Sequence, residues 1–296
     1  ELARIRYISK NIDFSKRKPS FIAGWLLSSA GIFCAKFIGL YDAVPYNAML
    51  GTADNLAYYG VAFNIYSYLL NICTAGFPFA IATLIAKYST RGDYQTSLLI
   101  KKLSASLMTC FGLGMMIIVI LFSSPLAALV MPDEGDSVKT MQMVLILISF
   151  ALFFVPLLSS IRGFYQGLKH MEIYALSQVL EQVARVAFLL SASAIAVYAL
   201  HTDQVWALYF GVISTSISAI LAIMHLKLYD KKQMRELKRL AKTQEVAGNN
   251  DRREILKELV FIAFPYLIVA ILGYSDTIVN TLFLSKGLEA HGNTDA

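Results

Sequence analysis

Charged residues are scarce in this sequence and unevenly distributed. They make up 16% of the 296 residues, against roughly 25% in an ordinary soluble domain. Four long stretches contain no Asp, Glu, Lys or Arg: Asn55 to Ala86, Leu103 to Pro132, Thr140 to Ile161 and Gln204 to Leu226. As helices, which rise about 1.5 Å per residue, each can span a hydrocarbon core of about 30 Å. The shortage of charge therefore excludes an ordinary soluble fold and indicates an integral membrane protein.

The sequence also lacks the motifs of several enzyme classes. It has no GxxxxGK[ST] phosphate loop, no HExxH and no GxSxG, so ATP-driven pumping within this chain and the commoner hydrolase reactions lack their residues. Three cysteines lie inside apolar segments without CxxC spacing, which is typical of small core residues and predicts neither a metal site nor a disulfide framework: Cys34, Cys73 and Cys110. We expect no catalytic residue and no cofactor.

The apolar segments predict an all-α, polytopic bundle of about seven transmembrane helices. The spans expected are Phe21 to Val44, Leu56 to Ile85, Leu103 to Val130, Met141 to Ser160, Ile173 to Leu200, Val205 to Lys227 and Leu259 to Leu284. The predicted partner of such a surface is the lipid bilayer.

The basic residues orient these spans, because Lys and Arg near span ends are retained on the cytoplasmic side. Of 26 Lys and Arg residues, 22 fall in the N-terminal arm and in the loops after the second, fourth and sixth spans. The net charge of +6 is therefore explained by topology, and we expect no nucleic-acid partner. The N-terminus is predicted to be cytoplasmic.

The expected domain organisation follows the spans. Residues 1–20 form a cytoplasmic arm, 21–228 a six-helix lobe, 229–257 a basic cytoplasmic linker, and 258–296 the first helix of a second lobe. Within the linker, Met234, Leu237, Leu240 and Ala241 lie at helical spacing among basic residues. This pattern fits either a surface helix against anionic headgroups or a solvated charged segment.

Ionisable residues inside a span are candidates for function because they are expensive to bury there. Glu181 and Arg185 are four residues apart on one helical face, so they form either a structural ion pair or a partly neutralised cation in a cavity. Lys36 either reaches the outer interface or contacts an anionic substrate in a central cavity. Asp276 follows Pro265 and Gly273, and it either binds a coupling H⁺ or Na⁺ or makes a structural bond.

Several motifs then carry a resemblance to a known family. The stretch Tyr58 to Tyr94, with NIYS, TAGFP and GDY, closely resembles the polysaccharide-transport, stage V sporulation protein B group of the multidrug/oligosaccharidyl-lipid/polysaccharide (MOP) flippase superfamily, which includes MurJ-type lipid II flippases. The segment Arg162 to Glu181 resembles the RGxxQG loop and SQxxEQ motif of that group, and Gln182 and Arg185 complete the signature. AKFIGL at Ala35 to Leu40 and SDTIVN at Ser275 to Asn280 are also similar.

The resemblance implies a flippase for undecaprenyl-diphosphate-linked saccharides, such as lipid II or a polysaccharide repeat unit. It implies a bacterial cytoplasmic membrane, and it makes this chain the N-terminal lobe with the first helix of a C-terminal lobe that is missing here. Lys36, Arg185 and Glu181 are the cavity residues that it implies for substrate binding. Ala35 stands where the family usually has Ser, and Tyr41 or Asp42 where a second basic residue is frequent.

Arg162 and Gly163 are expected at the cytoplasmic end of the fourth span. There Arg162 would meet phospholipid headgroups and Gly163 would form a tight turn.

Two other functions remain open at this point. A cation-coupled multidrug exporter of the same superfamily would favour acidic and aromatic cavity residues over basic ones. A membrane-bound glycolipid-modifying enzyme would need paired carboxylates or a catalytic histidine near an interface. Three histidines lie scattered near span ends, which does not favour this chemistry: His170, His201 and His225.

Overall fold

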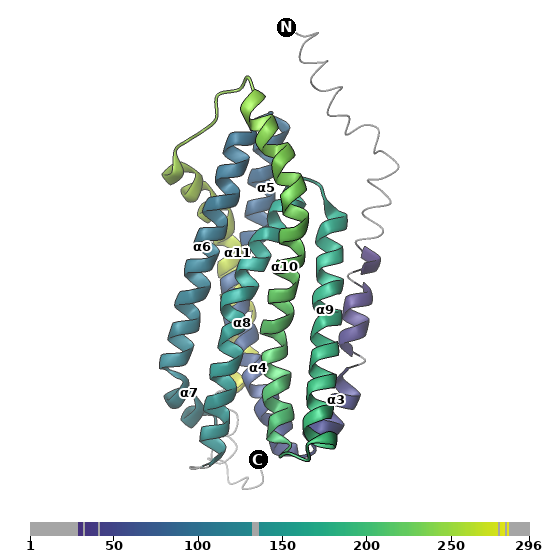
Figure 1. The fold of residues 1–296 in the computed structure, drawn as a ribbon. Coiled ribbons are helices and arrows are strands. Elements are labelled where there is room, and N and C mark those ends of the chain that lie inside the picture. Colours follow the sequence, from purple (N-terminus) through teal and green to yellow (C-terminus); the bar gives the residue numbers. More distant parts are fainter. Residues whose placement is uncertain are drawn as a thin grey trace.

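The computed structural model describes residues 29–31, 33–40, 42–131, 136–277, 279–281 and 283. Every regular element within these ranges is helical (Figure 1). The helices are α3 (Ala43–Leu50), α4 (Ala53–Thr74), α5 (Phe77–Thr90), α6 (Tyr94–Leu121), α7 (Ser123–Val130), α8 (Asp136–Gly167), α9 (Met171–Ala194), the π-helix η2 (Ile195–Ala199), α10 (Val205–Thr243) and α11 (Arg252–Gly273). Residues 33–40 are also helical.

Six stretches of the described chain are long and apolar enough to cross a membrane: Ala53–Thr90, Tyr94–Leu121, Asp136–Gly167, Met171–Ala199, Val205–Leu228 and Arg252–Thr281. They correspond to the second to seventh predicted spans, so the all-α polytopic fold is confirmed. The first predicted span falls largely outside the described residues, as does the arm at 1–20.

Helix α8 lies in the middle of the bundle, where it contacts α4, α5, α6, α7, α9 and α10 (Figure 1). Its buried residues contribute to two apolar clusters. One cluster lies near the C-terminal end of α10 and includes Leu158 and Phe164 of α8 with Ile81 of α5. The other lies near the opposite end of the bundle and includes Leu145 and Met141 of α8. The bundle is therefore held by apolar packing along the whole length of α8.

The second span is interrupted between α4 and α5 by the TAGFP motif. Gly76 has φ 67°, a conformation that glycine adopts without steric penalty, and Pro78 occupies the first turn of α5, where its missing N–H is not needed. A Cβ on Gly76 would lie 2.5 Å from Cβ of Tyr266, so α11 packs directly against this interruption. The motif that identified the family thus sets a helix break and a contact with α11.

The two glycines of the RGxxQG motif bring α8 close to α5. A Cβ on Gly163 would lie 2.8 Å from the carbonyl oxygen of Pro78, and one on Gly167 would lie 2.7 Å from that of Ala82. Small residues four apart allow such backbone contact between membrane helices. The tight turn expected at Gly163 is wrong, because this residue lies inside α8 and its small size serves helix packing.

The predicted linker begins as a continuation of the sixth span. Helix α10 runs without interruption to Thr243. Leu237 is buried in the apolar cluster near its end, with Met234 packed against that cluster, and Ala241 is also buried. The apolar stripe therefore faces the protein, so neither the headgroup-binding helix nor the merely solvated segment describes it. Tertiary packing fixes its orientation.

After α10, the chain docks on the start of α6 through polar contacts. The side-chain oxygen of Gln244 accepts hydrogen bonds from the backbone N–H groups of Tyr94 and Gln95, both at 2.9 Å. The backbone N–H of Asn249 donates to Oγ1 of Thr96 at 2.8 Å, and the buried carboxylate of Asp93 accepts from the Thr96 backbone N–H at 3.0 Å. The GDY motif is thus the place where the linker is held.

The N-terminal half of α11 packs against the preceding helices. Ile255, Leu259 and Ala263 are each 1% exposed and belong to the same cluster as α5 and α8. Nζ of Lys87 on α5 pairs with the carboxylate of Glu258, which also accepts a hydrogen bond from the Tyr88 hydroxyl at 3.4 Å. The boundary between two lobes, expected near residue 258, stays a prediction.

Candidate functional site

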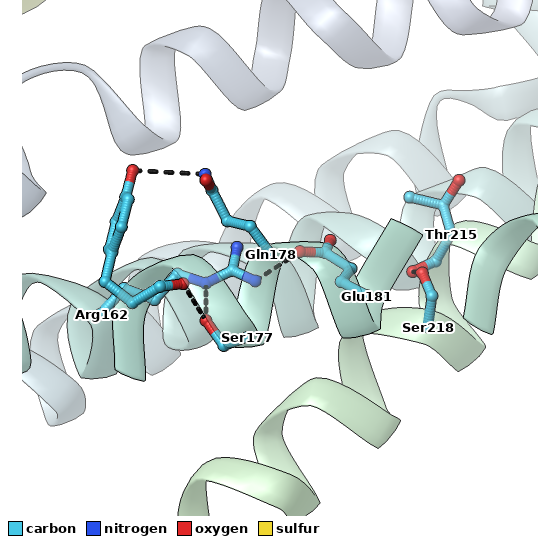
Figure 2. A network of polar contacts seen from close by, with 7 residues as sticks. Arg162, Ser177, Gln178, Glu181, Thr215 and Ser218 are labelled. Atoms are coloured by element: carbon cyan, nitrogen blue, oxygen red, sulfur yellow. Dashed lines mark hydrogen bonds and ion pairs between the residues drawn. The ribbon is translucent and has the colours of Figure 1, made fainter. Parts of the chain in front are cut away.

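Helix α9 carries both charged residues of the SQxxEQ signature, but they do not pair with each other. Glu181 pairs instead with Arg162 of α8, with 2.7 Å between Oε2 and Nη2. Figure 2 shows the guanidinium of Arg162 between Glu181 and Ser177, whose Oγ accepts a hydrogen bond from Nε at 2.8 Å. The ion pair that the four-residue spacing suggested within α9 is therefore replaced by one between two helices.

Arg162 is 8% exposed, so the predicted contact with phospholipid headgroups is wrong. The physical reason lies in the hairpin of α8 and α9. Arg162 precedes the turn at Lys169 by seven residues and Ser177 follows it by eight, which places both at a similar depth, about 10–12 Å from the turn. At that depth the guanidinium is surrounded by helices, and a carboxylate partner offsets its desolvation.

Arg185 points to a different carboxylate, that of Asp42. Its Nη2 lies 3.8 Å from Oδ2 of Asp42, a residue that is 7% exposed and that makes no side-chain capping bond at the start of α3. Nε of Arg185 is buried and has no hydrogen-bond partner. Arg185 is thus a half-buried cation with one distant counter-charge and an unsatisfied buried donor.

Sequence reasoning did not foresee Asp42 as the partner of Arg185. A usable signal was present, since Asp42 stands where the family often has a second basic residue. A carboxylate in that place suggests a counter-charge for a cation on another helix.

A cavity of about 230 Å³ lies beside Arg185. Its lining comes from α4, α8, α9 and α10 and combines aromatic, neutral polar and charged side chains: Phe63, Tyr66, Ser67, Leu70, Asn71, Val155, Glu181, Gln182, Arg185 and Thr215. Because Glu181 is already paired with Arg162, the group in the lining with the least complete charge compensation is Arg185.

Aromatic rings continue from this cavity along α4 toward α3. The ring centroids of Tyr66 and Phe63 are 5.9 Å apart, those of Phe63 and Tyr59 5.9 Å, and those of Tyr59 and Tyr46 5.2 Å. The Tyr46 hydroxyl donates to the carbonyl oxygen of Ala207 in α10. This row of aromatic contacts joins α4 to α10 through Tyr46 of α3.

The other sequence-predicted residues lie away from the cavity lining. Lys36 is exposed on the helix of residues 33–40, whose Gly39 faces Gln182 and Arg185 of α9. Asp276 is exposed beyond the end of α11 at Gly273. Nearby, Asn64 of α4 donates to the Thr281 hydroxyl at 3.3 Å, which ties this region to α4. Their suggested roles in substrate binding and ion coupling stay predictions.

Metal chemistry and histidine chemistry find no support in the described part of the chain. It holds no group of three or more His, Cys, Asp or Glu residues able to bind a metal ion. His170 makes a local contact with Glu172 at the start of α9, 3.2 Å between Nδ1 and Oε1.

Comparison with known proteins now identifies the family. Residues 21–296 match the family described as polysaccharide biosynthesis protein. The chain belongs to this family. The lipid II flippase MurJ of Bacillus subtilis (strain 168) is 30% identical over 256 residues, which cover 84% of this chain and 46% of that protein. Stage V sporulation protein B of the same strain is 26% identical over 169 residues, which cover 57% of this chain and 32% of that protein. The chain spans less than half the length of these relatives.

Solved structures of transporters share this fold. An outward-facing multidrug resistance MATE family transporter of the MOP superfamily matches with a TM-score of 0.64 and 16% identity, over 85% of this chain and 52% of that one. A MOP superfamily transporter from Pyrococcus furiosus matches with a TM-score of 0.59 and 15% identity, over 85% and 52%. At these identities the likeness concerns the fold alone.

The sequence resemblance and the fold together make this chain a multi-pass membrane protein of the MOP superfamily. Its named relatives are a flippase and transporters, which leaves the glycolipid-modifying enzyme without support.

Proposed function

We propose that this chain is the N-terminal lobe, with the first helix of the second lobe, of a flippase in the bacterial cytoplasmic membrane. The flippase moves an undecaprenyl-diphosphate-linked saccharide, either lipid II or a polysaccharide repeat unit, by alternating access between two lobes. The observation that carries the proposal is Arg185, a half-buried cation that lines a cavity and whose only described counter-charge lies 3.8 Å away. The similarity to the lipid II flippase MurJ supports the same substrate class.

The charges around the cavity favour an anionic ligand. Glu181 is neutralised by Arg162, so it does not cancel the field of Arg185 at the cavity. In surroundings of low dielectric constant, attraction between a guanidinium and a diphosphate is much stronger than in water. The planar fork of Arg can also donate two parallel hydrogen bonds to one phosphate. This balance supports the flippase over a multidrug exporter, for which acidic and aromatic cavity residues were expected to prevail.

Two further residues take roles in the proposal. Lys36, exposed on the helix that packs against α9, provides a second cation for the diphosphate. Asp276, beyond Gly273, is the candidate for a coupling H⁺ or Na⁺. In this proposal a complete pathway also needs the rest of the second lobe, and the chain spans less than half the length of the relatives it matches.

The proposal is tested in a flippase-depleted bacterium complemented by the full-length parent protein, with lipid II accessibility at the outer surface as the readout. We expect Arg185→Gln to abolish flipping at nearly normal protein abundance. Arg185→Lys should retain part of it, because the charge survives and the fork does not. Lys139→Gln is the matched control, since Lys139 is an exposed cation whose partner among the described residues is the exposed Asp136.

A second variant separates ligand binding from charge compensation. If Arg185 only neutralises Asp42, then Asp42→Asn combined with Arg185→Gln should restore both abundance and flipping. Restored abundance without flipping supports the proposal, and recovery of both contradicts it.

A further inference from the structure

Several polar side chains that line the cavity have no hydrogen bond to any described residue. The hydroxyls of Ser67 on α4 and Thr215 on α10 and the side-chain amide of Gln182 on α9 make none, although all three contribute to one cavity. Asn71 uses its Nδ2 to donate to the carbonyl oxygen of Ser67 at 2.7 Å, which leaves its side-chain oxygen available. Thr215 of α10 and Glu181 of α9, both drawn in Figure 2, line this same cavity.

Unsatisfied polar groups are expensive inside a membrane protein, because no lipid atom can replace the missing partner. Two other serine hydroxyls on the same helices bond to their own helix: Ser218 donates to the carbonyl oxygen of Thr215 at 2.9 Å, and Ser191 to that of Ala187 at 2.6 Å. Ser216 on α10, outside the cavity lining, is buried without a hydrogen-bond partner. The groups around the cavity therefore call for a ligand that both donates and accepts hydrogen bonds.

The chemistry of these groups is that of a carbohydrate site. Hydroxyls and amides are neutral and act as both donors and acceptors, which matches the hydroxyl and amide groups of a sugar better than it matches a second anion or a cation. Phe63 and Tyr66 add aromatic faces to the same lining, with ring centroids 5.9 Å apart. The negative face of an aromatic ring attracts the polarised C–H groups of a pyranose.

The size of the cavity limits how much ligand it takes. Its volume of about 230 Å³ is below the roughly 300–1,000 Å³ of sites for drug-sized ligands. It therefore suits one sugar ring rather than a whole saccharide with its peptide or further units. Arg185 lies in the same lining, so a phosphate bound there would be directly adjacent to the ring.

We propose that Ser67, Asn71, Gln182 and Thr215 form a carbohydrate subsite that binds the sugar attached directly to the diphosphate, while Arg185 binds the phosphate. This inference rests on the proposed flippase function and adds to it a basis for substrate choice. A site built around unpaired hydroxyl and amide groups discriminates strongly against a ligand that leaves those groups unsatisfied. The flippase thus recognises the first sugar of its substrate and not the lipid diphosphate alone.

The test compares two lipids on the full-length parent protein in nanodiscs. One is undecaprenyl diphosphate without sugar, and the other is undecaprenyl diphosphate that carries a single N-acetylated hexose. Binding is measured by native mass spectrometry for the unaltered protein and for the double variant Ser67→Ala with Thr215→Val. The loss of two hydrogen bonds should weaken binding of the sugar-bearing lipid about tenfold to a hundredfold and leave binding of the sugar-free lipid unchanged.

Two more variants keep the experiment decisive. If the double variant does not fold, Gln182→Met tests the subsite instead, because Gln182 is half-buried. The expected result is the same: weaker binding of the sugar-bearing lipid and unchanged binding of the sugar-free lipid. Ser218→Ala is the matched control, because its hydroxyl lies on α10 but bonds to its own helix, and it should change neither affinity.

The outcomes separate the subsite from the function. Equal loss for both lipids in the subsite variants, or no loss for either, overturns the carbohydrate subsite while the flippase function stands. Absence of binding of either lipid to the unaltered protein contradicts the proposed function itself. Phosphatidylglycerol is tested as a competitor. If it displaces the sugar-bearing lipid and its own affinity falls in the subsite variants, the site binds a glycerol headgroup and the carbohydrate subsite is overturned.

Discussion

The buried pair between Arg162 and Glu181 offers the sharpest test of the packing. Glu181→Gln leaves the guanidinium, whose side chain is 10% exposed, with the Ser177 hydroxyl as its main remaining partner. Breaking one partner of a buried ion pair costs about 3–5 kcal/mol. Because the Glu181 side chain is 20% exposed at the cavity, we expect the lower end, about 3 kcal/mol, which is a factor of roughly 10² in the ratio of folded to unfolded protein.

The measurement is equilibrium unfolding of the purified full-length protein in mixed micelles, followed by helical circular dichroism. Asp136→Asn is the control, since the pair of Asp136 and Lys139 is exposed and should contribute only about 0–1 kcal/mol. Glu181→Leu combined with Arg162→Met should recover most of the stability, because no unpaired charge then remains buried. If Glu181→Gln costs no more than the control, or if the double variant is as unstable as the single one, the pair does not hold α8 to α9.

Three further predictions concern packing and topology. Gly167→Val should lower protein abundance sharply, because a Cβ at Gly167 would lie 2.7 Å from the carbonyl oxygen of Ala82. Gly114→Val should be tolerated, because a Cβ there meets nothing within 4 Å. Immunoblots of membranes measure the abundance of both variants. Gln95→Cys with Gly248→Cys should form a disulfide under mild oxidation, since a Cβ on Gly248 would lie 3.1 Å from that of Gln95, and failure to cross-link would place the linker elsewhere. A cysteine at Lys169 should be labelled by an impermeant reagent only from the cytoplasmic side, and labelling from outside would invert the topology.

The sequence predicts the second to seventh spans well because a membrane imposes one dominant constraint. A charge-free run of about 20 residues has few alternatives to a spanning helix. The ends of elements are predicted less well. Helix α10 continues 15 residues beyond the hydrophobic stretch that ends at Leu228, since Leu237 and Ala241 bury themselves on neighbouring helices and not in lipid.

The candidate site shows which contacts a sequence hides. Glu181 and Arg185 were identified as important by their position in a span, but their partners belong to other helices. The partner of Glu181 was within reach of reasoning, because a hairpin places Arg162 near the depth of Ser177. For Arg185 the sequence offered only the hint that Asp42 is a counter-charge for some cation on another helix. That this cation is Arg185 depends on how α3 packs against α9, which no local pattern encodes. The docking of Gln244 on α6 is hidden for the same reason.

The seam between α5 and α8 has a mechanical consequence. At Gly163 and Gly167 one helix meets the backbone of the other, with no long side chain between them to change rotamer and absorb a displacement. The two helices must therefore move together as one rigid unit. Because Lys87 on α5 pairs with Glu258 on α11, a displacement of α8 at this seam is passed through α5 to α11.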